Sequence, residues 1–301
     1  MKHQTTQLIR FYFYICDDKN SDLLAECTRF SPNNCPKFTD EELVTCYLFA
    51  LGQGFSDSVK RAYAFIRDYW GDWFPNLPSY QAFNHRLNRL ADYWQALIGR
   101  LLTPVAKALS HQTVLVIDSC PIILCQGYRK SRTSWLVKGY CASKKKYYYG
   151  VKFHALALKQ AGLPLPLLVG FTDAKVHDLM AVKQNLLDNQ ILKGTTILAD
   201  KAYIDRDLEQ QLKKMECTLI TPEKHFRGTP ENIKQFDKAS HQQFNTFLAS
   251  NRQTIESLFS WLAQNRNFQN ASKVRSEKGL IVHLFAKLAS AICHWCGFSN
   301  P

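Results

Sequence analysis

The sequence lacks any apolar run that approaches the roughly 20 residues a membrane span needs, so we expect no membrane partner. The early stretch IRFYFYICDD runs into acids and has no cleavage-site pattern, which excludes a signal peptide. The ten cysteines have no regular spacing, which favours a reducing cytoplasm over a disulfide framework. The single CxxC, Cys293 to Cys296, has no second pair, so we interpret it as part of a helix core rather than a zinc or redox site.

Acidic residues are absent from one long segment. Between Ser119 and Thr172 there is no Asp or Glu, although the whole chain has 25 acidic and 38 basic residues and a net charge of +13. The basic residues of this segment are Arg129, Lys130, Arg132, Lys138, Lys144, Lys145, Lys146, Lys152 and Lys159. An ordinary solvated face would mix the two signs, so the segment indicates a polyanionic partner.

Residues 1–110 are predicted to form an all-helical domain. TDEE at 39–42 fits a capping box that starts a helix at Thr39. An apolar stripe at steps of three and four predicts another helix over 80–102. The polar side of this second helix carries Asn84, His85, Arg86, Asn88 and Arg89. Such a helix after a turn is typical of a helix-turn-helix that reads the major groove, and equally of a helical bundle with a basic solvated face.

From residue 111 onward, strands and helices alternate. Alternating and β-branched runs predict five strands, at 113–118, 146–159, 165–174, 195–200 and 217–222. The turn signal QAGLP joins the second and third strands into an antiparallel hairpin. Helical patterns cover 177–187, 204–215, 241–264 and 278–295, with a polar stretch at 223–240. The order predicts an α/β domain over 111–301, with a mixed five-stranded sheet and helices on both faces.

Three carboxylates occupy positions at which such a sheet would gather them. Asp118 ends the first predicted strand and Asp200 ends the fourth. If these strands are parallel neighbours, both side chains emerge at the same edge of the sheet. Two adjacent carboxylates repel unless a cation lies between them, and Mg²⁺ prefers oxygen ligands of this kind. A later helix supplies a third acid, Glu256, with Arg252 one turn before it.

Each of these residues also has an ordinary structural interpretation. Asp118 and Asp200 are each typical of a turn or a helix cap, and Arg252 with Glu256 is typical of a surface ion pair. The joint arrangement of two strand ends and one helix favours a metal site over three unrelated structural roles.

The motifs VIDS, LADKAY and RQTIES contain these residues. Together with the order of elements, they resemble the RNase H-like core of bacterial insertion-sequence transposases of the Asp-Asp-Glu class. The stretches YYYGVKFH and DAKVHDL fit the same family. With the N-terminal stretch FPNLPSYQAFNHRLNRL, the sequence is similar to the insertion-sequence group numbered nine-eight-two. The resemblance covers most of the chain, and LADKAY with RxxxE is more specific than either motif alone.

The resemblance implies a DNA transposase that cleaves strands and transfers them. It implies Asp118, Asp200 and Glu256 as catalytic residues and as ligands of two Mg²⁺ ions, or of Mn²⁺ in their place. It also implies double-stranded DNA as partner, both the terminal inverted repeats and the target, and a homodimer on DNA. Related transposases often carry a tyrosine three positions before the arginine and a lysine seven after the glutamate, where this chain has Ala249 and Ala263. The role of that lysine is therefore left open.

DNA contacts are expected from basic side chains near the site and in the acid-free segment. The expected set is Lys201, Arg252, Arg129, Lys130, Arg132, Lys138, Lys144, Lys145, Lys146, Lys152, Arg86 and Arg89. His154 and His177 are further candidates near the metals, although a hydrogen-bonded structural role is favoured for each. The alternative functions are a metal-dependent nuclease without strand transfer and a DNA-binding protein without catalysis.

Overall fold

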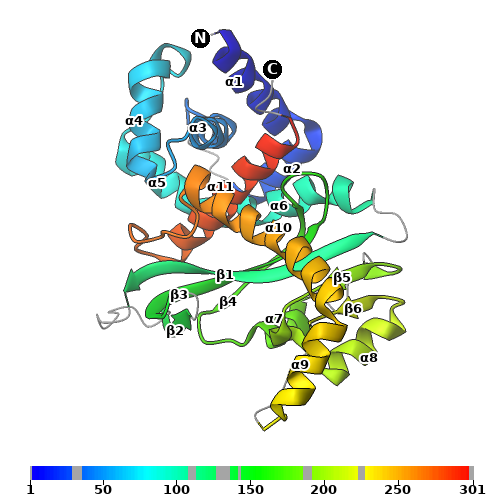
Figure 1. The fold of residues 1–301 in the computed structure, drawn as a ribbon. Helices are drawn as coiled ribbons and strands as arrows, with labels where there is room; N and C mark the ends of the chain where they lie inside the picture. The colour runs from blue at the N-terminus through cyan, green and yellow to red at the C-terminus, as the bar shows by residue number, and fades with distance from the viewer. Residues whose placement is uncertain are drawn as a thin grey trace. The chain divides into compact units, whose positions relative to one another are not determined.

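A computed structural model describes residues 2–28, 36–107, 113–126, 136–141, 144–185, 192–222 and 228–297 (Figure 1). The chain divides into two compact units, which we call unit 1 (Met1–Thr103 with Trp261–Pro301) and unit 2 (Pro104–Ser260). The functional division predicted from the sequence, 1–110 and 111–301, stays a prediction. None of the helices in these ranges is long and apolar enough to cross a lipid bilayer.

Unit 1 is built from helices, as its apolar periodicity predicts. They are α1 (Lys2–Cys16), α2 (Asp18–Cys27), α3 (Asp40–Gly52), α4 (Val59–Trp70), the 3-10 turn η1 (Gly71–Trp73), α5 (Tyr80–Arg89), α6 (Ala91–Lys107) and α11 (Glu277–Trp295). The predicted capping box is confirmed, because the Thr39 hydroxyl accepts from the N–H of Glu42 (3.2 Å) and the Glu42 carboxylate accepts from the N–H of Thr39 (2.6 Å). The helix predicted over 80–102 is instead two helices, broken at Leu90, whose ψ is 23°.

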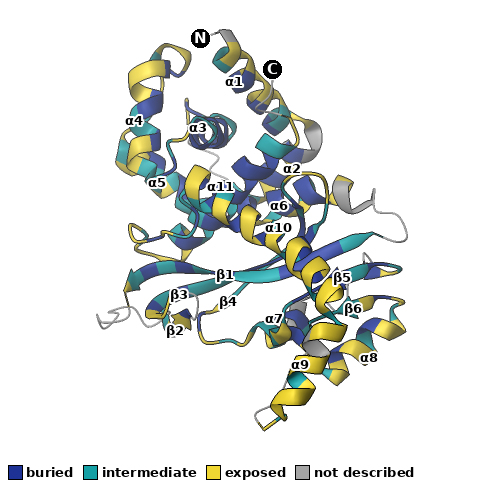
Figure 2. Ribbon diagram, viewed as in Figure 1, coloured by how far each residue is buried: buried dark blue, intermediate teal, exposed yellow. Residues whose placement is uncertain are grey.

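Helix α3 forms the centre of unit 1. Every residue from Leu43 to Leu51 is buried, and Figure 2 shows the helix dark blue around its circumference. A helix that is apolar on all sides needs neighbours on all sides. Aromatic rings supply part of that cover, with 4.9 Å between the ring centroids of Phe49 and Trp70 and 5.8 Å between those of Tyr47 and Trp94.

Unit 2 holds a mixed sheet of six strands. They are β1 (Val114–Gln126), β2 (Val137–Cys141), β3 (Lys146–Leu158), β4 (Leu165–Asp173), β5 (Thr196–Leu198) and β6 (Thr218–Ile220). The order is β2-β3-β1-β5-β6, with β4 also on β3. Strand β3 is antiparallel to β1, β2 and β4, whereas β5 is parallel to β1 and β6. The predicted α/β class, an RNase H-like mixed sheet flanked by helices, is confirmed.

The sheet and its helices differ from the prediction in three places. The helices of unit 2 are α7 (Asp178–Asn185), the turn η3 (Lys201–Tyr203), α8 (Arg206–Lys214), α9 (Glu231–Ser240) and α10 (Gln242–Arg266), whose last six residues belong to unit 1. Strand β1 does not end at Asp118 but continues to Gln126. The sixth strand, β2, is a short edge strand, and α9 lies in the stretch interpreted as a polar connection. Helix α9 is largely exposed, and β2 has only two buried residues, Gly139 and Cys141, so neither has a clear apolar period.

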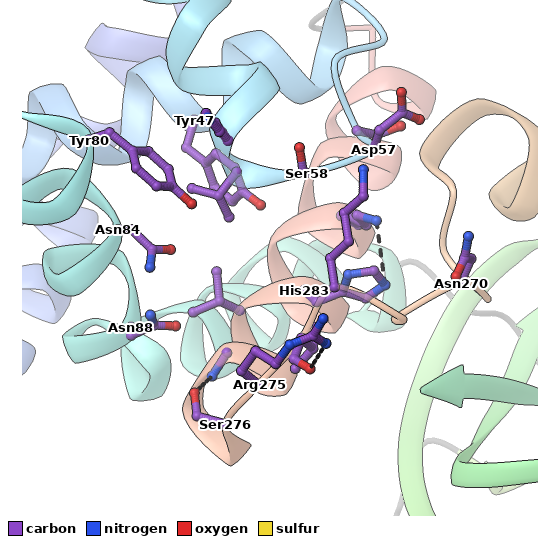
Figure 3. Close-up of a pocket in the computed structure, with 18 residues that line it drawn as sticks. Tyr47, Asp57, Ser58, Tyr80, Asn84, Asn88, Asn270, Arg275, Ser276 and His283 are labelled. Carbon is purple, nitrogen blue, oxygen red and sulfur yellow. Dashed lines mark hydrogen bonds between the residues drawn. The ribbon is translucent and has the colours of Figure 1, made fainter. Parts of the chain in front are cut away.

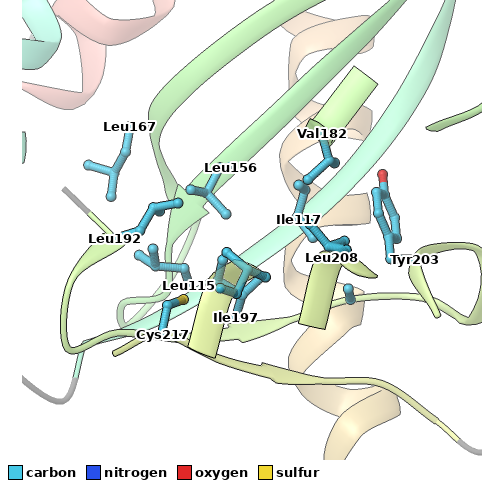
Figure 4. Packing of buried hydrophobic residues seen from close by; sticks show 12 residues of the cluster. Leu115, Ile117, Leu156, Leu167, Val182, Leu192, Ile197, Tyr203, Leu208 and Cys217 are labelled. Carbon is cyan, nitrogen blue, oxygen red and sulfur yellow. The ribbon is translucent and has the colours of Figure 1, made fainter. Parts of the chain in front are cut away.

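Different helices cover the two faces of the sheet. On one face, Leu115 and Ile117 of β1 pack with Val182 of α7 and Leu208 of α8 in a buried cluster (Figure 4). On the other face, Phe153 of β3 contacts Phe259 of α10, with 5.9 Å between the ring centroids. Because side chains alternate along a strand, we call these the α7 face and the α10 face.

Candidate active site

Strands β1 and β5 place Asp118 and Asp200 side by side. The last paired residues of these parallel strands are Val116 and Leu198. Each aspartate lies two residues further along, so both side chains project from the same face of the sheet. Asp118 is also paired with Ala155, two residues from Phe153, which puts it on the α10 face. The structure therefore brings these two predicted site residues together.

The environment of Asp118 opposes its ionisation. Burial is the main cause that raises the pKa of Asp118 from its usual value to about 6, and the charges of Asp200 and Asp178 act in the same direction. The N–H of Ser119, 2.7 Å from Oδ1 of Asp118, and the charge of Arg252 lower the pKa. A partly buried carboxylate beside two others is one whose charged form a cation would stabilise.

Asp200 caps a turn, which is one of the two roles considered for it, and its role as a metal ligand stays a prediction. Its Oδ1 accepts from the N–H of Lys201 at 2.5 Å and caps the turn η3. The same oxygen lies 3.5 Å from Nη1 of Arg252 on α10. The Arg252 side chain is 18% exposed and that of Asp200 44%, so this ion pair is partly open to solvent. The cap orients the carboxylate, and the pair shows that it can receive a positive charge.

Glu256 does not join the two aspartates. It lies one turn after Arg252 on α10, is exposed, and makes no ion pair or hydrogen bond with another described residue. Within the described ranges, no three His, Cys, Asp or Glu side chains gather closely enough to hold a metal ion. The shared helical stripe of Arg252 and Glu256 therefore brings only Arg252 to the site in this structure, and the ligand role of Glu256 stays a prediction.

The two aspartates fit one divalent cation. Mg²⁺ is usually held by one or two carboxylates, with water and substrate phosphate in its remaining positions. Asp118 and Asp200 supply two such carboxylates on one face, and the raised pKa of Asp118 marks an uncompensated negative charge. The donor set thus suits Mg²⁺ or Mn²⁺. Two ions per site, which need a third ligand, stay a prediction.

Tyr203 is a residue near the site that the sequence did not single out. It is 1% exposed, and its hydroxyl has no hydrogen-bond partner among the residues that the structure describes. Burial raises the pKa of Tyr203, as do the charges of Asp178, Asp118 and Asp200, whereas Arg252 lowers it. Its position three residues after Asp200 in LADKAY indicated that it lies near the site. The burial of its ring depends on contacts with distant segments, which the short motif does not reveal.

Asp178 is the second such residue, and it supports the site from the α7 face. Its Oδ1 accepts from the hydroxyl of Ser119 at 3.0 Å and from Nζ of Lys152 at 3.1 Å. Lys152 also donates to the carbonyl of Val176 at 2.8 Å. Because Ser119 follows Asp118 directly, this network fixes β1 at the point where Asp118 emerges on the other face.

Replacing the carboxylate of Asp178 tests this network. We expect Asp178→Asn to lower the free energy of unfolding by about 2 kcal/mol, because the half-buried ammonium of Lys152 loses its counter-charge. Urea unfolding measures this change. The exposed Asp173, at the end of β4, offers a matched control, and Asp173→Asn should leave the stability unchanged within about 0.5 kcal/mol. Equal losses in both variants would contradict the network.

The two histidines have structural surroundings. His154 is 7% exposed on the α7 face, and its Nε2 lies 2.8 Å from the hydroxyl of Thr172. Burial lowers the pKa of His154 to about 4, so the ring is neutral. His177 is exposed, and its Nδ1 accepts from the N–H of Leu179 at 3.4 Å. Neither ring belongs to the cluster of Asp118 and Asp200.

Part of the predicted DNA-binding set forms an exposed basic surface. Lys138, Lys144, Lys145 and Lys146 are exposed on and around β2 and β3, as is Lys201 in η3. Nζ of Lys138 lies 4.8 Å from the ring centroid of Tyr147, which is itself 5.0 Å from that of Tyr140. Arg129, Lys130 and Arg132 fall outside the described residues.

Other members of that set are held by carboxylates. Lys152 is bound to Asp178, as described above. Arg86 forms a close ion pair with the buried Asp40, and Nη2 of Arg89 lies 3.2 Å from the same carboxylate. The Asp40 side chain is only 4% exposed, so these arginines neutralise a charge inside unit 1. Their role in DNA binding stays a prediction, beside this structural role.

Comparison with known families places most of the second half of the chain in a family of known type. Residues 109–293, which are 185 of the chain's 301, match the family model described as "Transposase DDE domain". The matched region contains Asp118, Asp200 and Glu256. Searches of curated proteins and of solved structures gave no significant match.

Proposed function

The chain belongs to the family of DDE transposases, and from that premise we propose that it is the transposase of a bacterial insertion sequence. The family acts on DNA and generally uses divalent metal ions. The observation that carries the proposal is the placement of Asp118 and Asp200 on one sheet face, with Arg252 beside them. The motifs VIDS, LADKAY and RQTIES support the closer assignment to the group numbered nine-eight-two.

The proposed reaction is phosphoryl transfer in two displacements. Water attacks a phosphodiester at the end of the element, the bond from phosphorus to the 3′ oxygen breaks, and the 3′ oxygen takes up a proton. The new 3′-hydroxyl then attacks a phosphodiester of the target, whose own 3′ oxygen leaves. A divalent ion, when bound, supplies Lewis-acid activation and offsets the charge on the leaving oxygen.

The side chains of the site have distinct roles in this reaction. Asp118 and Asp200 would hold the ion, with Glu256 as the third expected ligand. Arg252 binds a phosphate oxygen next to the bond that breaks, and Lys201 binds the following phosphate. Positioning and charge neutralisation account for the rate, with no covalent intermediate on the protein.

The partner in this proposal is double-stranded DNA. The exposed Lys138 and Lys144–Lys146, with Tyr140 and Tyr147, bind its backbone through charge and through packing on sugars. A homodimer holds the two terminal inverted repeats before they join the target, and the protein works on DNA in the bacterial cytoplasm.

The test is a strand-transfer assay with purified protein, Mg²⁺ and labelled DNA that carries the sequences flanking the gene. We expect defined nicks at the ends and longer joined products on a denaturing gel. Both should disappear with Asp200→Ala, because one of the two metal-holding carboxylates is lost, and both should disappear with EDTA.

Three results would point elsewhere. Cutting without joined products would identify a nuclease on the same core. DNA binding with no cutting, unchanged by Asp200→Ala, would identify a DNA-binding protein without catalysis. Cutting that Asp200→Ala leaves intact would make Asp200 a structural cap of η3 and overturn the mechanism.

A further inference from the structure

Unit 1 contains a polar cavity that the proposed reaction does not use. Its volume is about 480 Å³, and it lies among α3, α4, α5, α11 and the residues just before α11 (Figure 3). Four cationic side chains line it, against the single carboxylate of Asp57. These are Lys60, Lys273, Arg275 and Lys287. Asp57 is itself paired with Arg61, so the cavity has an excess of positive charge and suits an anion.

Lys287 is the buried cation of this cavity. It is 2% exposed in α11, and its Nζ donates to the carbonyl of Asn267 at 3.0 Å. No ion pair among the described residues includes it, because Asp57 is near but not in contact. Burial lowers the pKa of Lys287 to about 7; Asp57 raises this pKa and Lys273 lowers it. A buried ammonium without a counter-charge is costly and is stabilised by a bound anion.

His283 does not supply the missing acceptor. Its Nε2 lies 3.4 Å from Nζ of Lys287 and 3.0 Å from the carbonyl oxygen of Phe268. A carbonyl oxygen can only accept, so this Nε2 carries the hydrogen of the ring. Burial lowers the pKa of His283 to about 3, which leaves the ring neutral. Lys287 therefore keeps two N–H groups that no described side chain or carbonyl accepts.

Two helices begin at the wall of the cavity. Ser58 caps α4, where its hydroxyl accepts from the N–H of Arg61 at 3.3 Å, and Ser276 caps α11, where it accepts from Gly279 at 3.1 Å. The other amides of each first turn have no partner within their helix. Helix N-termini favour anions through these amides and through the helix dipole. They act here together with Lys287 and the cations at the rim.

The size of the cavity and its uncharged lining residues indicate a ligand larger than an inorganic anion. A volume of about 480 Å³ lies within the range of about 300–1,000 Å³ that small-molecule sites occupy, and it exceeds the volume of a phosphate group. Asn84, Asn88 and Asn270 also line the cavity. A carboxamide both donates and accepts, which matches the edge of a nucleobase, above all adenine. The wall thus suits a phosphate that carries a nucleoside.

We propose that this cavity is a phosphate-binding site that takes a backbone phosphate of a DNA strand together with its nucleoside. Its residues all belong to unit 1, whereas the carboxylates of the reaction belong to unit 2. The choice of DNA as the source of the phosphate rests on the proposed function, whereas recognition of phosphate rests on the cavity alone.

The test measures DNA affinity of the full chain in EDTA, so that no cleavage is needed. Fluorescence anisotropy of a labelled duplex and of a labelled single strand compares the wild type with Lys60→Ala/Lys273→Ala and with Lys287→Met. We expect each variant to bind about tenfold more weakly, because charge-assisted hydrogen bonds to phosphate are lost. The slope of log affinity against log salt should become shallower by about one. Lys278→Ala is the matched control, since Lys278 is exposed in the first turn of α11 and does not line the cavity.

A second measurement separates ligand loss from misfolding and identifies the source of the phosphate. Thermal unfolding is followed in sodium phosphate, in adenosine monophosphate and in chloride at equal ionic strength. Lys287→Met should unfold at a higher temperature than the wild type without ligand, because a buried uncompensated charge is removed. It should also lose the stabilisation that phosphate gives the wild type.

The outcomes are distinct. Wild-type protein that fails to bind any DNA overturns the proposed function. Wild-type protein that binds DNA with the same affinity and salt slope as the cavity variants overturns the DNA site. If these variants lose stabilisation by phosphate or the mononucleotide but keep their DNA affinity, the occupant is a free anion or nucleotide, and the DNA source is overturned.

Discussion

Asp118→Asn is expected to abolish strand cleavage and, without metal, to make the protein more stable. The folded-state pKa of this carboxyl is about 6, above its unfolded value near 3.9, so the folded protein holds the charged form at a cost. The protonated form contributes favourably to the free energy of unfolding. This contribution is complete below about pH 4 and is lost as the pH rises through 6. The amide removes this loss, which we expect to be on the order of 2 kcal/mol at pH 7.5.

The measurement for Asp118→Asn is urea unfolding in EDTA at pH 4.5 and at pH 7.5. The stabilisation should be large at pH 7.5 and small at pH 4.5. Cleavage with Mg²⁺ should fall by about 10³-fold or more, because a metal contributes several kcal/mol to the transition state. Asp173→Asn serves again as the exposed control. Destabilisation of Asp118→Asn at both pH values would show that the carboxylate is structural.

Gly150→Ala is expected to disrupt the sheet of unit 2. Gly150 lies in β3 between β1 and β2, opposite Ile123 at a bulge of β1. A Cβ at this position would lie 1.9 Å from the carbonyl oxygen of Ile122, which is backbone and cannot rotate away. The strands must separate, so we expect a loss of about 3 kcal/mol or more in the free energy of unfolding.

Circular dichroism during thermal unfolding measures the effect of Gly150→Ala. A loss of this size corresponds to a fall of roughly 10 °C in the melting temperature. The matched control is Gly99→Ala, an exposed glycine inside α6, where the added Cβ would have no described atom outside its own helix backbone within 4 Å. That change should be neutral or stabilise by about 0.5–1 kcal/mol, since alanine favours the helix. Similar behaviour of the two variants would show that β1 and β3 are not closely paired at Gly150.

The sequence predicted the parts of this fold that depend on local patterns. The apolar runs that lead to Asp118 and Asp200 could be recognised from their β-branched residues, although β1 continues past Asp118 to Gln126. The hairpin of β3 and β4 could be recognised from its turn residues. The break between α5 and α6 could not, because the apolar stripe continues through Leu90, which is fully buried. Periodicity reports which face is buried, and the same face can persist across a change of helix.

The rest of the site depends on contacts between distant segments. Asp178 meets Ser119 across 59 positions of the sequence, and Lys152 approaches it from a third element. Arg86 likewise meets Asp40 across 46 positions, so its charge suggested a DNA contact where the structure shows an internal partner. The shared helical stripe predicted that Arg252 and Glu256 lie on the same side of α10, but only Arg252 reaches Asp200. Periodicity gives the side of the helix on which a residue lies and not its distance from a neighbouring strand.

In the proposed reaction Asp200 holds a divalent ion and Arg252 a DNA phosphate, and the ion pair between them would make these two binding equilibria depend on each other. A phosphate bound to the guanidinium would release Asp200 for the ion, and an ion on Asp200 would release Arg252 for phosphate. Such linkage is reciprocal: each ligand must raise the affinity of the other by the same factor. The pair spans 3.5 Å and is partly solvated, so its worth is at most about 1 kcal/mol. Cooperativity between DNA and metal through Arg252 is therefore limited to about fivefold.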